Sequence, residues 1–296
     1  MTAQRRPLAF YKMHSLGNDF MVVDAVSQTV HLSTEQIARW GDRHTGIGFD
    51  QLLIIEPPTT PDADFYYRIY NSDGSSAQQC GNGTRCVAML AQKLQLTKKN
   101  TLNWQSAAGP ICTVYESPEQ IKTTMTVPVL ELDNIPFNAS AASPILDSHA
   151  QMYRIEAEGS QYEVTPVSMG NPHAVIFLDD IFEIDIDVIG AKLTGHEAFP
   201  EGANIGFCQI IDRQFMRLRV YERGVGETRA CGSGACAAVV AAKLQERVDD
   251  RVKVSLPGGK LKIKWPHRES AVTMHGAATF VFSGEIDQDG ELSSRH

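Results

Sequence analysis

Two cysteines, Cys80 and Cys231, each stand in a C-G-x-G motif that opens a run of small and apolar residues. The first run reads CGNGTRCVAMLAQKL and the second reads CGSGACAAVVAAKL. A thiolate is stabilised at a helix N-terminus, where orphan backbone N–H groups and the helix dipole favour negative charge, so we expect both thiol pKa values to fall toward neutrality. The glycines let a ligand approach those N–H groups closely. Each motif therefore predicts a thiol acid/base beside a carboxylate site.

The two motifs belong to a longer internal repeat. RIYNSDGSSAQQCGNG (68–83) aligns without a gap with RVYERGVGETRACGSG (219–234). Upstream, IGFDQLL answers IGFCQII, and LGNDF answers MGNPH, in the same order in both halves. Two copies make a pseudo-symmetric pair, whereas stacked arrays need at least three repeats. We therefore expect two diverged copies of one folding unit.

Paired thiols suit the inversion of a carbon centre. If the two copies face each other, one thiolate can remove a proton from one face while the other thiol delivers a proton to the opposite face. The α-hydrogen of an amino acid is a weak acid, and two helix N-termini directed at the carboxylate would stabilise the developing carbanion without a cofactor. Cys80 and Cys231 are the predicted catalytic residues.

Other interpretations of the cysteines are weaker. A single C-G-x-G at a helix start is more often a turn or packing feature, but duplication in register argues against that here. The remaining four fit the core better, because they are out of register or lie in strand-like runs: Cys86, Cys112, Cys208 and Cys236. A zinc site needs closer spacing than that of Cys80 and Cys86. A nucleophilic cysteine with a histidine base leaves the second cysteine unexplained, although three histidines are available: His14, His44 and His173.

Composition limits the classes of partner. The chain has 296 residues, 43% of them apolar and 21% charged, which is ordinary for a globular protein. Its net charge of −8 argues against nucleic acid and against an anionic membrane, both of which bind clustered Lys and Arg. No apolar run has the length of a membrane span or the pattern of a signal peptide. We expect a cytoplasmic protein whose cysteines are mostly reduced.

Local patterns predict many short strands and few helices. Runs such as QLLIIE and KLKIKW are rich in β-branched residues and bounded by turn residues, and LPGGK indicates a hairpin turn. One helix begins at STEQIARW, with Ser33 as N-cap and Gln36 completing a capping box, and another spans part of IDVIGAKLTG. The helices after the two cysteines are apolar on nearly every side, which indicates that other structure encloses them.

These patterns predict an α+β fold of two pseudo-symmetric lobes, each a β-barrel-like strand shell around a central buried helix. The N-terminal lobe, 1–128, carries Cys80, and the C-terminal lobe, 129–276, carries Cys231. Prolines and small residues interrupt the pattern at VPVLELDNIPFNASAASP, which marks the break. We expect the final strand, about 277–296, to return to the first lobe.

Six ordered blocks resemble those of the diaminopimelate epimerases: KMHSLGNDF, RHTGIGFDQ, YNSDGSSAQQCGNGTRC, GNPHAV, ANIGF and YERGVGETRACGSGA. The resemblance implies an isomerase, independent of pyridoxal phosphate, that interconverts LL- and meso-diaminopimelate in lysine and peptidoglycan precursor synthesis. It implies an active site in the cleft between the lobes, no cofactor or metal, and a homodimer. Two departures are Ser15, where the family often has Gly, and Phe282, where many members have Tyr.

The resemblance also implies roles for individual residues. It implies that Cys80 and Cys231 are the acid/base thiols. It places four backbone N–H groups on the carboxylate of the reacting centre, those of Gly81, Asn82, Gly232 and Ser233. It places seven side chains around the rest of the substrate: Asn18, Gln51, Asn71, Asn171, Asn204, Glu222 and Arg223. Two residues are candidates for orienting the thiols, His173 and Glu222.

The repeat is asymmetric where the distal end of the substrate is expected. Asn71 and Ser72 in the first copy correspond to Glu222 and Arg223 in the second. Arg223 offers a planar fork to a carboxylate, and Glu222 can accept from an ammonium group.

A proline or hydroxyproline racemase-like enzyme would use the same thiol chemistry, but a cyclic monocarboxylate has no distal head to hold. A non-catalytic metal- or ligand-binding protein is the remaining alternative.

Overall fold

The computed structural model describes residues 7–77, 80–107, 109–146, 148 and 150–287. The chain divides into two compact units: unit 1 runs to Thr123 and resumes at Gly276, and unit 2 spans Thr124–His275. The sequence places the break a few residues later, after 128. Strands dominate and helices are few, so the predicted α+β class is confirmed. Among the described residues, no helix has the length and apolar character needed to cross a membrane.

Unit 1 is built from these elements: β1 (Leu8–Ser15), β2 (Asn18–Asp24), α1 (Thr34–Gly41), β3 (Gln51–Glu56), β4 (Phe65–Asn71), β5 (Ser76–Ala77), α2 (Gly81–Lys93), β6 (Thr101–Gln105), β7 (Ile111–Ser117), β8 (Gln120–Thr124) and β19 (Thr279–Ile286). The last strand, β19, pairs antiparallel with β1 and so belongs to this unit. Ser33 caps α1, and the reciprocal bonds with Gln36 form the capping box expected from the sequence.

Unit 2 repeats the plan with these elements: the short 3-10 turns η1 (Leu132–Asn134) and η2 (Ala139–Ala141), β9 (Ser143–Ile145), β10 (Met152–Ala157), β11 (Ser160–Ser168), β12 (Pro172–Phe177), α3 (Ile186–Thr194), β13 (Asn204–Asp212), β14 (Phe215–Glu222), β15 (Gly226–Thr228), α4 (Gly232–Leu244), β16 (Arg251–Leu256), β17 (Gly259–Lys264) and β18 (Thr273–Gly276). The predicted LPGGK turn joins β16 to β17, with Leu256 opposite Gly259.

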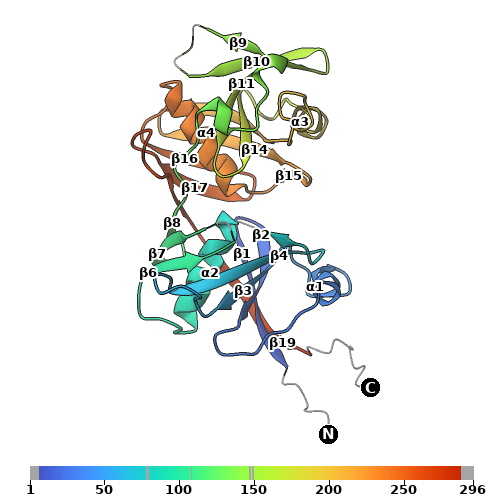
Figure 1. Ribbon diagram of the computed structural model, residues 1–296, viewed down its shortest axis with the longest axis vertical. Helices are drawn as coiled ribbons and strands as arrows, with labels where there is room; N and C mark the ends of the chain where they lie inside the picture. Colours follow the sequence, from blue (N-terminus) through green and yellow to red (C-terminus); the bar gives the residue numbers. More distant parts are fainter. Residues whose placement is uncertain (1–6, 78–79, 108, 147, 149, 288–296) are drawn as a thin grey trace. The chain divides into compact units, whose positions relative to one another are not determined.

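The sequence repeat is also a repeat of topology (Figure 1). In unit 1, α1 connects the parallel strands β2 and β3, and in unit 2 α3 connects the parallel strands β12 and β13. Parallel neighbours need such a crossover, and a helix usually supplies it. Each unit then continues through an antiparallel pair, β3–β4 or β13–β14, and a parallel pair, β4–β6 or β14–β16. The two cysteine-led helices occupy equivalent places in these two plans.

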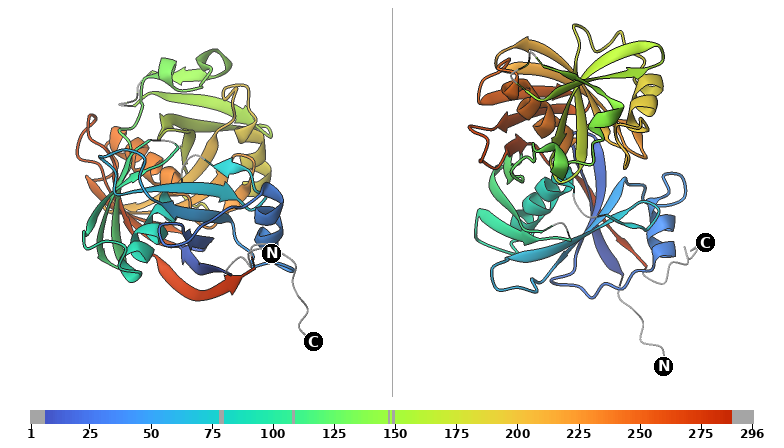
Figure 2. Two further views of the ribbon diagram at one scale, coloured as in Figure 1. Left: turned by 60° about the horizontal axis from the view of Figure 1, so that its bottom comes forward. Right: turned by 45° about the horizontal axis from the view of Figure 1, so that its top comes forward.

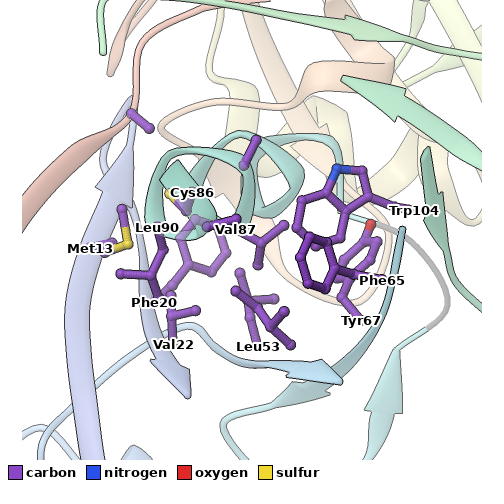
Figure 3. Close-up of a cluster of buried hydrophobic side chains, with 14 of the residues drawn as sticks. Met13, Phe20, Val22, Leu53, Phe65, Tyr67, Cys86, Val87, Leu90 and Trp104 are labelled. Atoms are coloured by element: carbon purple, nitrogen blue, oxygen red, sulfur yellow. The ribbon is translucent and has the colours of Figure 1, made fainter. Parts of the chain in front are cut away.

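Strands enclose both of these helices within their own units (Figure 2). In α4 nearly every residue from Gly232 to Ala242 is buried. Helix α2 is also mostly buried, and its Val87 and Leu90 pack with Phe20 and Leu53 of the strands (Figure 3). The all-round apolar pattern in the sequence correctly indicated enclosed helices, because a helix exposed on one side carries polar residues there.

An aromatic group closes the unit 1 core beside α2 (Figure 3). Trp104 of β6 lies edge-on to Tyr67, with ring centroids 5.9 Å apart, and 5.3 Å from Phe65. Its indole N–H donates to the hydroxyl of Thr113 on β7 over 2.8 Å, and both residues are fully buried. The hydrogen bond satisfies a donor that burial would otherwise leave without water.

We predict that Thr113→Val lowers the free energy of unfolding by about 1–3 kcal/mol, because Val keeps the shape but leaves the buried indole N–H unpaired. Thr113→Ser, the control, keeps the hydroxyl and loses one methyl group, at a cost of about 1 kcal/mol. Urea unfolding followed by circular dichroism measures both. A Val variant as stable as the parent would mean that the indole N–H finds another acceptor.

Candidate active site

Both repeated cysteines are N-cap residues of buried helices. The sulfur of Cys80 accepts the backbone N–H of Gly83 over 3.2 Å, and the sulfur of Cys231 accepts that of Gly234 over 3.4 Å. Ser, Thr, Asp or Asn usually fills this position, because a side-chain acceptor satisfies an otherwise orphan helix N–H. In this chain a thiol takes that place in both units, as the sequence motif predicted.

The second glycine of each motif makes room for the sulfur. A Cβ at Gly83 would lie 3.0 Å from the side chain of Leu53 and 3.4 Å from the sulfur of Cys80. A Cβ at Gly234 would lie 3.1 Å from Val220 and 3.2 Å from the sulfur of Cys231. Such contacts are tighter than ordinary van der Waals packing. The C-G-x-G spacing therefore lets the helix start pack directly on a strand while its N–H reaches the thiol.

The expected fall in thiol pKa is wrong for Cys231. This side chain is buried, and burial raises its pKa well above the ordinary value for a thiol. The negative charge of Glu222 raises the pKa further, while the Ser233 hydroxyl and the Gly234 N–H lower it. Desolvation of the thiolate thus outweighs the helix N-terminus in this structure.

In unit 1 the structure brings three predicted residues together. The Cys80 thiol lies 3.7 Å from Oδ1 of Asn18, which accepts it, and Nδ2 of Asn82 donates to the same oxygen over 3.4 Å. Asn18 begins β2, and Asn82 lies in the first turn of α2. Backbone N–H groups of that turn, including Gly81, lie at the same helix end. This group forms one half-site around the first thiol.

Gln51 and Asn71 form a second pair in unit 1, opposite each other on β3 and β4. Nε2 of Gln51 donates to Oδ1 of Asn71 over 3.1 Å, and Nδ2 of Asn71 donates to the Ser75 hydroxyl over 3.0 Å. Oε1 of Gln51 is buried and has no hydrogen-bond partner among the described residues. A buried acceptor of this kind is suited to a donor group of a ligand, such as an ammonium.

In unit 2, strand register brings the predicted polar residues together. His173 lies opposite Asn204 across the parallel strands β12 and β13. Oδ1 of Asn204 accepts the backbone N–H of Arg223 over 3.0 Å, at the end of β14. Glu222 precedes it, acts electrostatically on Cys231, and accepts the hydroxyl of Thr228 over 2.5 Å. The Ser233 hydroxyl lies 3.6 Å from the sulfur of Cys231. Glu222 and Ser233 thus act directly on the second thiol, and Asn204 and His173 lie on the adjoining strands.

His173 is fully buried, and burial lowers its pKa to about 3. The imidazole is therefore neutral at physiological pH. Its Nε2 lies 3.1 Å from Oδ1 of Asn171, so with that amide orientation Nε2 carries the proton and donates. A neutral ring with a fixed tautomer can orient its neighbours without adding charge.

Arg223 is anchored by backbone carbonyls. Its Nη1 donates to the carbonyl of Glu201 over 2.6 Å and approaches that of Gly202 at 3.5 Å. Gly202 has a positive φ of 71°, and a Cβ there would lie 2.8 Å from Cδ of Arg223. A glycine at this turn lets the long side chain lie along the backbone, which fixes the direction of an otherwise exposed guanidinium.

The other cysteines show no clustering of ligands. Cys86, Cys208 and Cys236 are fully buried, and Cys112 on β7 is half-buried. Within the part of the chain that the structure describes, no group of three or more His, Cys, Asp or Glu side chains could hold a metal ion.

Three contacts of the half-sites were missed in the sequence. Asp50 accepts from Asn18, Arg85 donates to Asn82, and Thr228 donates to Glu222. Two of these residues carried a signal. Asp50 stands directly before Gln51 in the repeated I-G-F-x-Q block, and Arg85 is a charged residue in a helix otherwise apolar enough to be enclosed.

Solved structures share the fold at low sequence identity. A hydroxyproline epimerase from Agrobacterium vitis matches with a TM-score of 0.69 and 14% identity, over 97% of this chain and 94% of that one. A phenazine biosynthesis protein from Bacillus anthracis matches with a TM-score of 0.62 and 17% identity, over 95% and 99%. A probable proline racemase from Agrobacterium radiobacter K84 gives 0.64 and 14%, over 94% and 92%.

Closer relatives are found by sequence. Proteins of Ectopseudomonas mendocina and Azotobacter vinelandii, both named diaminopimelate epimerase, are each 48% identical over 279 residues, which is 94% of this chain and 99% of each relative. The family model described as diaminopimelate epimerase matches residues 10–131 and 165–281, which include both cysteine motifs and the polar residues around them. The resemblance drawn from the sequence is thereby confirmed, and the chain belongs to the diaminopimelate epimerase family.

Proposed function

We propose that this chain is a diaminopimelate epimerase, an isomerase that interconverts LL- and meso-diaminopimelate in the synthesis of lysine and peptidoglycan precursors. The observation that carries the proposal is the duplicated thiol N-cap, with the sulfurs of Cys80 and Cys231 each bonded to a helix N–H in equivalent places of the two units. Family membership supports the choice of substrate.

The proposed chemistry is a two-base proton transfer in which both half-sites act on one substrate. A cysteine thiolate takes the α-proton, so the Cα–H bond breaks and an S–H bond forms. The other cysteine, as a thiol, delivers its proton to the opposite face of the carbanion and becomes a thiolate. Exchange with solvent then resets the two sulfurs. Which of Cys80 and Cys231 acts as base depends on the configuration of the incoming centre.

The backbone supports this step electrostatically. The N–H groups at the starts of α2 and α4, those of Gly81, Asn82, Gly232 and Ser233, are proposed to bind the carboxylate of the reacting centre. Negative charge moves onto that carboxylate as the α-proton leaves. Preorganised donors stabilise such developing charge without reorganising, so the helix ends can replace a cofactor as the electron sink.

The distal amino acid head is assigned to side chains that differ between the units. Arg223, held in place through Nη1, can bind the distal carboxylate, and Glu222 can accept from the distal ammonium. The buried Oε1 of Gln51 is a further acceptor for an ammonium. Asn18, Asn71, Asn171 and Asn204 complete the proposed set as donors and acceptors. The unreactive centre then keeps its configuration because only one orientation of the substrate satisfies this asymmetric set.

We predict that Cys80→Ala and Cys231→Ala each abolish conversion of LL- to meso-diaminopimelate, because each removes one of the two proton carriers. The measurement is α-proton exchange in D2O, followed by NMR with reduced enzyme and no added cofactor. Ala91→Gly, a substitution in the buried body of α2 away from the thiol, is the control for helix integrity and is expected to retain activity.

Two results would redirect the proposal. Conversion by either alanine variant at the parent rate would rule out the two-base mechanism. Exchange with L-proline in place of diaminopimelate would keep the thiol chemistry and move the substrate to a cyclic amino acid, the reaction class named for two structures that share the fold.

His173 is proposed to orient its neighbours as a neutral residue and not to carry protons in the reaction. Its folded pKa of about 3 lies below the ordinary value of 6.5. Between these values the unfolded chain binds a proton that the folded chain does not, so the free energy of unfolding rises with pH in this window. The contribution of neutral His173 to the free energy of unfolding is fully present above pH 6.5. Below pH 6.5 the free energy of unfolding falls by up to about 1.4 kcal/mol per pH unit.

We predict that His173→Gln flattens this pH dependence between pH 6.5 and 4, because glutamine has no proton to gain. Urea unfolding at several pH values measures the slope for parent and variant. His44→Gln, at an exposed loop position, is the matched control. Equal slopes in parent and His173→Gln proteins would show that the histidine is accessible to protons in the folded state.

We also propose a homodimer, supported by the apolar surface of β19. Val281 and Phe282 are 51% and 46% exposed on this strand. We predict that Phe282→Glu converts the protein to a monomer in light scattering at micromolar concentration, because a charge cannot be buried in an apolar interface without large cost. Phe182→Glu, at a site 65% exposed in unit 2, should leave the assembly unchanged. A Phe282→Glu protein with the parent mass would place any interface elsewhere.

A cytoplasmic location is proposed on chemical grounds. The six cysteines, all among the described residues, form no disulfide, and the proposed reaction needs two of them reduced. Reducing compartments keep such thiols available.

A further inference from the structure

A relay of hydrogen-bonded side chains runs past Cys80, from the buried Arg85 through Asn82 and Asn18 to the carboxylate of Asp50. Arg85 of α2 is fully buried and donates to the carbonyl of Gly81 over 3.2 Å and to Oδ1 of Asn82. Nδ2 of Asn82 donates to Oδ1 of Asn18 over 3.4 Å, and Nδ2 of Asn18 donates to Oδ2 of Asp50 over 2.9 Å. Two amides therefore link a guanidinium to a carboxylate, and the first thiol lies beside them.

The two ends of this relay determine the direction of the amides between them. A guanidinium can only donate hydrogen bonds, and an ionised carboxylate can only accept them. Asn82 must then turn its oxygen to Arg85 and its nitrogen to Asn18. Asn18 must turn its nitrogen to Asp50, which leaves Oδ1 facing the Cys80 thiol, 3.7 Å from its sulfur. The orientation of the Asn18 amide, which is ambiguous for an isolated side chain, is set from both sides.

Asp50 is itself held in place by hydrogen bonds. Arg43 donates to its Oδ1 over 2.6 Å, and the backbone N–H of Asp19 donates to its Oδ2 over 3.0 Å. Asp19 lies in the same ion-pair cluster: burial opposes its ionisation, but hydrogen bonds from Arg43 and Lys12 outweigh burial and lower its pKa. The cluster thus keeps an acceptor in place at the end of the relay.

We propose that Arg85 and Asp50 are positioning residues that fix the Asn18 amide oxygen toward Cys80, and so hold the resting Cys80 as a protonated thiol that donates to it. A hydrogen bond from the neutral S–H favours the thiol, and an amide oxygen facing a thiolate disfavours the charge. On the proposed function, on which its catalytic meaning rests, a protonated Cys80 is the form that can donate a proton as the acid. The Gly83 N–H, which donates to the same sulfur, acts in the opposite sense.

Two further ionisable groups lie beside Cys80. Tyr67 of β4 and Cys86 of α2 both act electrostatically on it, and burial raises the pKa of each, so both are neutral near pH 7.

The positions in unit 2 that align with Asp50 and Asn18 are occupied and bonded differently. The position that aligns with Asp50 in the I-G-F-x-Q block is Cys208, and the amide of Asn171 binds His173.

The experiment measures alkylation of Cys80 by iodoacetamide as a function of pH, resolved by peptide mass spectrometry, in full-length protein without substrate. We expect Asp50→Ala to lower the midpoint pH of Cys80 alkylation by about one unit or more, because the 3.4 Å bond from Asn82 alone holds the Asn18 amide less firmly, so the amide can turn its N–H to the sulfur. One unit is a roughly tenfold larger thiolate fraction below the midpoint. The extent of Cys231 alkylation in the same digest is the internal reference and should be unchanged.

Two variants separate amide direction from simple loss of charge. Asp19→Asn removes one negative charge from the same cluster but leaves the Asp50–Asn18 bond. Asp50→Asn removes the charge at residue 50, yet the Asp19 N–H requires an acceptor there, so the new amide should present its oxygen and keep the relay. We expect small and similar shifts from both. An Asp50→Ala shift no larger than that of Asp19→Asn, or no shift at all, would overturn the proposal.

The Asp50 side chain is 43% exposed, so its truncation opens no cavity. Should Asp50→Ala nevertheless fail to fold, Asp50→Ser, whose hydroxyl is too short to reach Asn18, makes the same test. The measurement uses no substrate. A shifted midpoint in a protein without epimerase activity would reject the proposed function and retain the relay, whereas an active enzyme with an unshifted midpoint would reject the relay alone.

Discussion

The structure depends on placing a sulfur at the start of a helix that is itself buried. For the thiols of Cys80 and Cys231 to serve as N-caps, each helix must begin inside a shell of strands with its first N–H groups directed at the sulfur. That requirement explains the second glycine of each motif, which lies against Leu53 or Val220, and the small apolar residues that follow it.

Burial that positions these groups also opposes their charges. It raises the pKa of Cys231 and lowers that of His173, so both rest in neutral forms. A thiol that is hard to ionise is a strong base once ionised, which suits removal of a weakly acidic α-proton. Burial opposes negative charge, and the fixed backbone N–H groups at the helix starts oppose this effect, because they stabilise negative charge where it develops. On the proposed mechanism, charge stabilisation would be confined to the carboxylate of the reacting centre.

Much of this arrangement could be predicted from the sequence because it rests on local patterns. The paired motifs, the capping box at Ser33 and the β16–β17 turn depend on residues close in the chain. The strand β6 also follows a local pattern, because Leu102 and Trp104 alternate with exposed residues as a half-buried strand requires. Contacts such as Asp50 with Asn18 were out of reach, because strand pairing and side-chain rotamers create them. The pKa of Cys231 was misjudged because a motif reveals the helix end but not the depth of burial.

The pseudo-symmetric frame explains why the polar residues of the two units differ. Identical units would present identical surroundings to the two faces of a substrate, and a molecule with two amino acid heads could then bind in either direction. In unit 1 the amide beside the thiol, Asn18, is held by a carboxylate, whereas in unit 2 its counterpart, Asn171, is held by a neutral imidazole. The strand ends differ too, since Asn71 is replaced by Glu222. The backbone repeat supplies the two proposed proton carriers, and the side chains that diverged on it give each thiol different surroundings, which would let the substrate bind in one orientation.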